Sequence, residues 1–565
     1  MTTPAVSTLG TSEQQLMDSV YKLSDAGGSI IQIRSREVPR TLTTLRKSIL
    51  ADDTNVYKEW DQINGWRNIF SLENFSEHIT PGDSQLDYDT AVLAPMNDMR
   101  NATSAVNADS DKMHYFIYVD FHTFIEGNPR IIAAMQQYAA VLPARNVCII
   151  LLTPEVNLSD LPLGTVLSVD APTPTAEELE GCLRRLVEAS ADAWPEDLDI
   201  KDADYHLISH LGLGMTRYEF ETYASIAIVE AGHKKDPMLT AEDLVHGISV
   251  GKTEVVKQSD ILELFHTEDM SEVGGMQRLK DWINNRADAF SDEAQEFGVE
   301  APKGIAIVGV PGTGKSLVAK AIASALNAPL LRLDFGRVFS KFIGDSESRM
   351  RSALKMVESM GHLVLFADEI DKGLGGIGQG GGDSGTSSRV LGAFLTWMQE
   401  NKSKVFVIVT ANRIDGLPPE LFRKGRLDQV FSVGLPSASE RVEVLEVHLR
   451  KRGRDINDFT DKEITLFKAA SEGRVPAEIE ASVKDGLVSA FNDDDAQDLE
   501  MHHIIDALEE SVPMSKSHAT AINAMVEWAR DNATPVNYED VPVVPKSAGP
   551  GGEPVRRSVV RPRRV

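Results

Sequence analysis

One stretch, Gly304 to Ser316, limits the possible folds of this chain more than any other, and it reads GIAIVGVPGTGKS. The apolar run Ile305 to Val308 is typical of a buried parallel strand, and the run from Leu317 to Leu326 is typical of a helix. Between them, Gly309 and Gly314 hold the fixed glycine positions of G-x-x-x-x-G-K-[ST], a loop whose backbone N–H groups surround phosphate. A purely structural glycine turn would not need strand, helix and every fixed position together, so the stretch predicts a nucleotide phosphate site.

The last two residues of this loop carry polar side chains, and the chemistry of phosphate binding gives each an expected role. Lys315 is expected to neutralise the β- and γ-phosphates, and the Ser316 hydroxyl is expected to hold Mg²⁺. The predicted nucleotide-binding residues of the loop are Gly309, Pro311, Gly312, Thr313, Gly314, Lys315, Ser316 and Leu317.

Two further apolar strands end in polar residues. Leu363 to Ala367 runs into Asp368 and Glu369, an acid pair with two jobs: Asp368 holds Mg²⁺ through its water shell, and Glu369 polarises the attacking water. Val405 to Val409 leads to Asn412, which is predicted to sense the γ-phosphate or to orient water. Asparagine at a strand end is also an ordinary turn residue, so this position is weak evidence alone.

Two arginines, Arg423 and Arg426, follow in the run LPPELFRKGRLD. Two interpretations stay open: they are surface charges, or they reach the γ-phosphate in a neighbouring subunit. An arginine supplied in this way would require an oligomer, because its own site is out of reach.

Length and charge limit the remaining possibilities. The chain of 565 residues is too long for one hydrophobic core, so about two to four domains are expected. A net charge of −28 argues against bulk attraction to nucleic acid or to anionic membranes. Cys148 and Cys182 are the only cysteines and form no C-x-x-C pair, which favours a reducing compartment. With no signal pattern and no membrane-length apolar run, a cytoplasmic or stroma-like soluble location is expected.

The first half of the chain predicts a second α/β unit whose chemistry is missing. Strands are expected at Ser29 to Ile33, Tyr115 to Val119 and Val147 to Leu152, with helices at Thr41 to Ala51 and Pro129 to Leu142. Ser35 to Arg40 stands where a phosphate loop would lie, yet it contains no glycine. A helical region follows from Thr175 to about Val256, and Gly251-Lys252-Thr253 within it resembles a phosphate loop only by chance.

The phosphate loop, Asp368-Glu369, Asn412 and the arginine pair together resemble the AAA family of AAA+ ATPases over roughly Asp269 to Leu508. The sequence is similar to those of AAA proteins encoded as hypothetical open reading frames in plastid genomes and cyanobacteria, above all in DSGTSSRV from Asp383 and LPPE from Leu417. That resemblance extends into the N-terminal half. It implies ATP and Mg²⁺ as ligands and a homo-oligomeric ring, expected to be a hexamer.

The same resemblance assigns further positions. Glu272 to Met276 resembles the adenine-side segment, with Val273 and Gly274 as the expected contacts, and Phe342 stands where the family has a pore-loop aromatic that grips a substrate polypeptide. An aromatic buried in its own domain is the alternative for Phe342. The glycine-rich run Gly373 to Gly385 is expected to be a mobile second pore loop, or else a plain linker.

One departure from the family pattern lies in the helical lid. Pro476 replaces the usual glycine before the acid Glu478, which suits the first turn of a helix but puts backbone contacts to adenine in doubt. Whether Arg474 serves there as a nucleotide sensor is left open.

Weak internal repeats predict two tandem AAA-like modules, the first degenerate. CIILLT from Cys148 echoes VIVT from Val407, and SVDAP from Ser168 echoes SVGLP from Ser432. The expected fold class is α/β, with a parallel sheet and a helical lid in each module. The expected domains are a flexible tail (1–13), a degenerate α/β domain (14–174), a lid-like helical domain (175–257), a linker with the adenine-side segment (258–303), the ATPase core (304–436), the lid (437–512), and a C-terminal helix with a disordered Arg-rich tail (513–565).

The sequence therefore predicts an ATPase that remodels a protein or protein complex. A regulatory protein that uses ATP to switch assembly without threading is the first alternative, and a nucleic-acid motor acting through the Arg-rich tail is the second, which the net charge disfavours.

Overall fold

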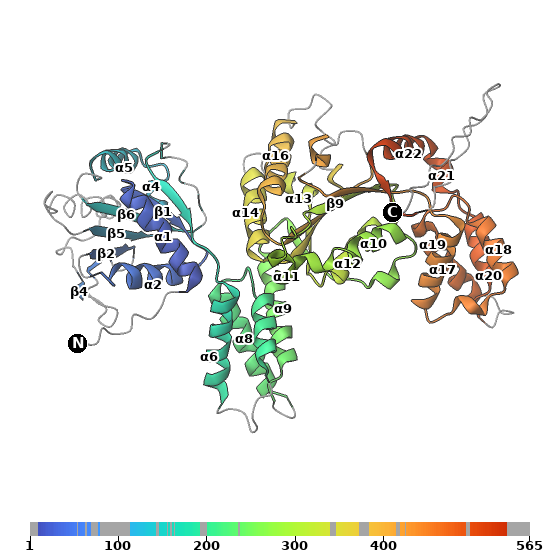
Figure 1. Cartoon of the computed structure of the whole chain (residues 1–565), viewed down its shortest axis with the longest axis horizontal. Helices are drawn as coiled ribbons and strands as arrows, with labels where there is room; N and C mark the ends of the chain where they lie inside the picture. Colours follow the sequence, from blue (N-terminus) through green and yellow to red (C-terminus); the bar gives the residue numbers. More distant parts are fainter. Residues whose placement is uncertain are drawn as a thin grey trace. The chain divides into compact units, whose positions relative to one another are not determined.

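The computed structural model describes residues 10–52, 55–62, 65–68, 77–78, 113–142, 146–154, 156, 158, 161–162, 164–191, 200–234, 238–339, 346–371, 384–413, 419–423, 425–492 and 498–538. The chain divides into two compact units, Met1–Val255 and Val256–Val565 (Figure 1). Within the described ranges, no helix combines the length and apolar character needed to cross a membrane.

The first unit begins with a seven-stranded sheet of order β4-β3-β2-β5-β6-β1-β7. Five of these strands pair in parallel, and β3 and β4 add an antiparallel edge. The strands are β1 (Ile30–Arg34), β2 (Val56–Asp61), β3 (Gly65–Asn68), β4 (Glu77–His78), β5 (His114–Val119), β6 (Val147–Thr153) and β7 (Leu167–Asp170). The predicted parallel sheet is present, but its antiparallel edge was not predicted.

Helices cover both faces of this sheet. Residues of α1 (Thr11–Asp25) and α2 (Val38–Ile49) pack on one face, and residues of α4 (His122–Ile125) and α5 (Pro129–Val141) pack on the other. Every position of β6 is buried, as expected for a strand covered on both faces. Helix α1 begins at Thr11, so its first three residues fall within the predicted flexible tail (1–13).

A four-helix layer completes the first unit (Figure 1). It consists of α6 (Ala176–Ser190), α7 (Asp202–Leu211), α8 (Arg217–Gly232) and α9 (Ala241–Lys257), which share one apolar core. Lys252 lies inside α9, and its Nζ donates to the Leu211 carbonyl oxygen at 2.9 Å. Gly251-Lys252-Thr253 therefore lies within a helix, which is consistent with the prediction that its resemblance to a phosphate loop is due to chance.

The second unit contains another seven-stranded sheet, of order β14-β13-β9-β12-β11-β10-β8. All pairs are parallel except that of β8 with β10. The strands are β8 (Leu262–Phe265), β9 (Gly304–Gly309), β10 (Leu330–Leu333), β11 (Leu363–Ala367), β12 (Val405–Ala411), β13 (Gln429–Val433) and β14 (Thr534–Pro535). The predicted strands at 305–308, 363–367 and 405–409 all lie in the centre of this sheet.

Two helical layers and a lid surround the second sheet (Figure 1). The first layer has α10 (Gln277–Asn284), η4 (Ala287–Phe290) and α12 (Lys315–Ala325), and the second has α13 (Phe335–Phe339), α14 (Ser346–Ser359) and α16 (Ser384–Glu400). The lid has α17 (Ala438–Arg450), α18 (Asp461–Ala470), α19 (Pro476–Phe491) and α20 (Met501–Glu509) around a separate core. The remaining helical elements are η3 (Met270–Glu272), α11 (Asp292–Glu296), η5 (Pro419–Phe422), η6 (Ile456–Asp458), α21 (Met514–Ser517) and α22 (Ala519–Asn532).

The two sheets share one strand order. In the first unit the parallel strands run β7-β1-β6-β5-β2, and in the second they run β13-β9-β12-β11-β10. Numbered by their place in the chain, both read fifth, first, fourth, third, second, and each sheet is followed by four lid helices. The predicted tandem modules are confirmed. In each module the first β-strand lies between the fourth and the fifth, and a ligand site is expected at the carboxyl ends of such parallel strands.

Candidate functional site

The phosphate loop joins β9 to α12, and its backbone is shaped by glycines. Gly314 (φ 86°) immediately precedes α12 in the left-handed region, and Gly312 (φ 79°) is left-handed too, so both positions favour glycine. A Cβ on Gly312 would lie 3.1 Å from Val475 and 3.2 Å from Ala477 of the lid. The loop therefore lies directly against the lid at the N-terminus of α12, a helix end that attracts anions.

Gly309 has a different reason to be glycine. A Cβ there would lie only 2.6 Å from the carbonyl oxygen of Val433 in the neighbouring strand β13. Its glycine is thus required by strand packing, in addition to any role near phosphate.

Lys315 is the first residue of α12 and lies among backbone carbonyls. Its Nζ donates to the oxygens of Gly309 and Val310, both at 2.9 Å. Burial lowers the pKa of Lys315 to about 8, although the carboxylates of Asp371, Asp368 and Glu369 oppose that shift. Neutral carbonyls compensate a buried ammonium poorly, so an anion in this loop would be strongly favoured.

The acid pair follows β11, and Thr410 of β12 connects both residues. The Thr410 hydroxyl donates to Asp368 Oδ1 at 2.8 Å and accepts from the Glu369 N–H at 3.0 Å. Burial raises the pKa of Asp368, while the Thr410 hydrogen bond and Arg332, 3.4 Å from Asp368 Oδ2, lower it. Glu369 has φ 48°, a strained value for a non-glycine residue.

Asn412 directly contacts the second acid. Its Nδ2 donates to Glu369 Oε1 at 2.8 Å, and its backbone N–H donates to Asp371 Oδ1 at 3.1 Å. The remaining amide oxygen, Asn412 Oδ1, is buried and has no hydrogen-bond partner among the described residues. A buried unpaired acceptor beside a carboxylate is suited to an additional donor, such as a water molecule.

One cavity of about 320 Å³ joins these groups, a volume in the range of small-molecule sites. Its lining residues are Pro311, Gly312, Gly314, Lys315, Ser316, Leu317, Asp368, Glu369, Asn412, His448, Pro476, Ala477 and Glu480. Three sequence motifs, spread over residues 309–412, thus meet at the carboxyl ends of β9, β11 and β12.

The predicted arginines lie elsewhere. Neither Arg423 nor Arg426 belongs to the described lining of this cavity. Arg423 is exposed, whereas Arg426 donates to the Glu420 carbonyl oxygen at 2.6 Å. Phe342 and most of the run Gly373 to Gly385 fall outside the described residues.

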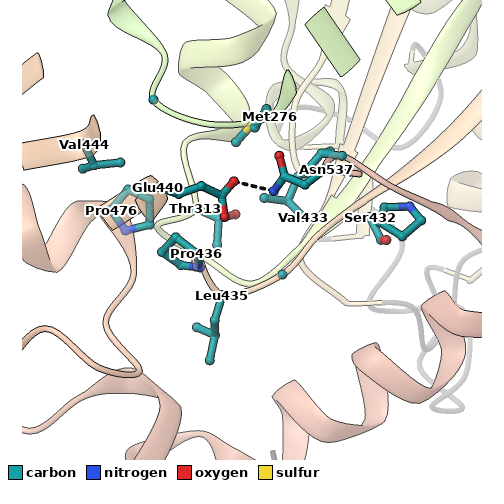
Figure 2. A pocket seen from close by; sticks show the side chains of 14 residues that line it. Met276, Thr313, Ser432, Val433, Leu435, Pro436, Glu440, Val444, Pro476 and Asn537 are labelled. Atoms are coloured by element: carbon teal, nitrogen blue, oxygen red, sulfur yellow. Dashed lines mark hydrogen bonds between the residues drawn. The ribbon is translucent and has the colours of Figure 1, made fainter. Parts of the chain in front are cut away.

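Two smaller cavities adjoin the phosphate loop on the base side, and Figure 2 shows one of them. Both are lined by Gly274, Met276, Thr313, Val444 and Pro476, and Val273 lines one of them. Apolar side chains from the core and the lid therefore face each other around two cavities of about 30 Å³ each. Pro476 is the first residue of α19, so the predicted place for proline in a helix holds.

Sequence analysis missed two lid residues of the cavity, His448 and Glu480. His448 Nδ1 is buried without a hydrogen-bond partner in the described part of the chain, and burial lowers the pKa of this imidazole. His448 lies between Val447 and Leu449 in an amphipathic helix, where the sequence pattern alone indicates a core residue.

Arg474 does not face the cavity. Its guanidinium is buried in the lid, where it contacts the Leu508 carbonyl, the Ser511 hydroxyl and Glu478, 3.6 Å away. The Arg474 guanidinium thus links the first turn of α19 to the last turn of α20.

The residues of the site fit a nucleotide with Mg²⁺. Lys315, His448 and Asn412 line a cavity with a helix N-terminus at one end, and His448 Nδ1 and Asn412 Oδ1 have no hydrogen-bond partner among the described residues. No cluster of three or more His, Cys, Asp or Glu among the described residues could hold a metal by itself. Mg²⁺ is commonly held by one or two protein ligands together with phosphates, which suits Ser316 and Asp368.

In the first module, side chains of the chain itself fill the corresponding region. Glu37, just before α2, accepts from the Tyr218 N–H at 2.9 Å, in the first turn of α8. Arg40 donates to Glu178 Oε2 of α6 at 3.0 Å. The Glu37 carboxylate thus binds the N-terminus of α8, the helix that corresponds to α19 in the second module. This region also lacks the glycines of a phosphate loop.

The pKa of Lys315 predicts how ATP affinity depends on pH. The free protein loses this proton near pH 8, whereas a bound triphosphate would keep it on the ammonium to higher pH. Binding above pH 8 must therefore take up a proton, and affinity should fall by about tenfold per pH unit there and be unaffected by this group below pH 8. Fluorescence titration with a labelled ATP analogue from pH 6.5 to 9.5 measures this slope.

Lys315→Met should bind ATP roughly 10- to 100-fold more weakly and lose this pH dependence. Lys320→Met is the matched control, because Lys320 lies on the same helix and pairs with Glu268 at 3.6 Å instead. An equal slope in wild type and Lys315→Met would refute the assignment of the titrating group.

Two segments of the chain match known families. Residues 305–435 match the ATPase family associated with various cellular activities (AAA), and residues 16–163 match the N-terminal domain of SpoVK-like AAA ATPases. The two matched segments contain most strands of the two sheets, but not β7, β8 or β14.

Similar proteins extend this match over most of the chain. The uncharacterized AAA domain-containing protein ycf46 of Guillardia theta is 35% identical over 415 residues, which cover 73% of this chain and 78% of that protein. The ycf46 protein of Gracilaria tenuistipitata var. liui is 34% identical over 418 residues, with 73% and 81% covered. Protein CdcH of Halobacterium salinarum is 32% identical over 248 residues, 43% of this chain and 33% of CdcH. With the phosphate loop and acid pair facing one cavity, these matches show that the chain belongs to the AAA family of ATPases.

Proposed function

We propose that this chain hydrolyses ATP in the presence of Mg²⁺ and uses the energy to remodel a protein or protein complex. The observation that best supports hydrolysis is the hydrogen bond from Asn412 Nδ2 to Glu369 Oε1, 2.8 Å long, in the cavity that Lys315 also lines. A carboxylate held by an amide opposite a phosphate loop is the arrangement that activates water for attack on a γ-phosphate.

Each side chain has a proposed part in the reaction. Lys315 exchanges its two backbone carbonyls for phosphate oxygens and offsets their negative charge. Glu369 accepts a proton from the attacking water, and Asn412 holds that carboxylate in place while its Oδ1 accepts from the water. Ser316 and Asp368 are the proposed Mg²⁺ ligands, Asp368 through water. The metal would withdraw electron density from the phosphate oxygens.

Arg423 and Arg426 are proposed to complete the site of a neighbouring subunit in a homo-oligomeric ring, with a hexamer as the expected size. The exposed position of Arg423, away from its own cavity, supports this proposal. Phe342 is proposed to contact the substrate polypeptide, on the resemblance of its segment to a pore loop. A switch of assembly without threading remains the second candidate.

Phosphate release and light scattering together test the proposal. Wild-type protein with ATP and Mg²⁺ should release phosphate and scatter as a multiple of the 61.9 kDa chain, and chelation of Mg²⁺ should stop release. Release that is unchanged by a chelator, or a single-chain mass under all nucleotide conditions, would refute it. Phe342→Ala should then abolish activity on a partner if the chain threads it, and leave that activity intact if ATP only switches assembly.

A further inference from the structure

The chain returns to the nucleotide site after its last helix. Helix α22 packs against Val310 of the phosphate loop and Val475 of the lid, and the following residues, Thr534–Tyr538, extend along the sheet. We name Thr534–Tyr538 the C-terminal strap. Its first two residues form β14, which pairs in parallel with β13 and so adds an edge strand beside the strand that leads into the lid.

The strap supplies the N-terminal cap of α10. The Val536 carbonyl oxygen accepts from the N–H groups of Arg278 and Leu279, at 2.9 and 3.2 Å, and Asn537 Oδ1 accepts from the Gln277 N–H at 3.2 Å. The preceding residue, Met276, makes no side-chain cap, so these three N–H groups rely on a segment about 260 residues away. Uncapped N–H groups at a helix start are costly, so the strap fixes where α10 begins.

The start of α10 matters because Glu272 to Met276, the segment expected to lie on the adenine side, comes directly before it. Gly274 and Met276 line the cavity of Figure 2, and Met276 is left-handed at φ 58°. Val536 is 3% exposed and packs in the same core as Val273 and Met276. The strap thus holds the segment that is proposed to contact the nucleotide base.

Asn537 also reaches the lid. Its Nδ2 donates to Glu440 Oε1, the dashed bond of Figure 2, and Glu440 belongs to the first turn of α17. The other oxygen of Glu440 accepts from the Ser437 N–H at 2.8 Å, which fixes the carboxylate. The Asn537 amide therefore accepts from the core helix α10 and donates to the lid helix α17, beside a cavity that Met276 and Glu440 both line.

We propose that the C-terminal strap is part of the nucleotide-binding machinery, and that Asn537 is a positioning residue that couples the base-side segment to the lid. This proposal rests on the proposed ATP binding. It adds that ATP affinity depends on a segment that lies outside both family-matched stretches and follows the lid helices. A strap that serves only to stabilise the fold would change the unfolding temperature without a specific change in nucleotide affinity.

A swap of the hydrogen-bonding groups tests this proposal. Asn537→Asp keeps the acceptor for the Gln277 N–H but places a second carboxylate against Glu440, so ATP affinity should fall by about tenfold. Glu440→Gln added to Asn537→Asp restores one donor and one acceptor between the two side chains and should recover most of the affinity. Asn532→Asp is the control, because among the described residues Asn532 donates to Trp528 of its own helix.

Equilibrium titration with a labelled ATP analogue measures affinity, and thermal unfolding without nucleotide checks that each variant is folded. Equal affinity of wild type and folded Asn537→Asp would overturn the inference, as would a double variant that binds no better than the single one. If Asn537→Asp does not fold, recovery of both folding and affinity in the double variant supports the contact, and recovery of folding without affinity overturns it. Absence of ATP binding by wild type would instead refute the proposed function.

Discussion

Glu369→Gln is expected to bind ATP as tightly as wild type and to release phosphate more slowly by a factor on the order of 10² to 10⁴. The glutamine oxygen can still accept the 2.8 Å hydrogen bond from Asn412, so the shape of the site is kept, but a neutral amide cannot take a proton from water. Steady-state phosphate release and equilibrium ATP binding, measured on the same preparation, separate the two effects.

Glu358→Gln provides the control for that substitution. Its Oε1 accepts from Trp397 Nε1 at 2.9 Å on the far helical layer, outside the cavity. Phosphate release should then stay near the wild-type rate. A Glu369→Gln protein with full turnover would show that another group activates the water.

Arg423→Ala is expected to lower phosphate release by a factor on the order of 10³, with ATP affinity unchanged. The reason is the proposed contact of Arg423 with a neighbour's γ-phosphate, since Arg423 is exposed and lies outside the described lining of its own cavity. Arg351→Ala, which removes an ion pair with Glu347 on α14, is the control.

Mixing variants distinguishes a neighbour's arginine from a structural one. Lys315→Met chains have a disabled phosphate loop but an intact Arg423, and Arg423→Ala chains have the reverse. A mixture should regain part of the wild-type rate, since one kind of neighbour completes the other's site. A mixture as inactive as its components would contradict a shared site.

The central strands and the acid pair were predictable because their signals are local. An apolar run ending in a fixed motif needs no knowledge of its neighbours, and the predicted 363–367 strand matches β11 without a shift. Asn412 was identified by its place after a strand, and its contact with Glu369 follows because parallel strands end at one edge.

The features that sequence analysis missed depend on distant partners. Strand β14 has two residues and exists only through its pairing with β13, and β8 is an antiparallel edge of four residues. His448 carries no local signal, since its unpaired Nδ1 is revealed only when the lid is placed over the loop. Gly309 was expected to be glycine for phosphate, yet the approach of Val433 also requires it.

One cavity is proposed both to bind ATP and to hydrolyse it through Glu369. The most direct measurement is a single-turnover experiment in which radiolabelled ATP is added to wild-type and Glu369→Gln protein, and bound nucleotide and free phosphate are counted over time. Wild type should convert its bound ATP to ADP and phosphate, while Glu369→Gln should retain intact ATP. Equal release of phosphate by both proteins, or bound ATP that neither protein hydrolyses, would contradict it.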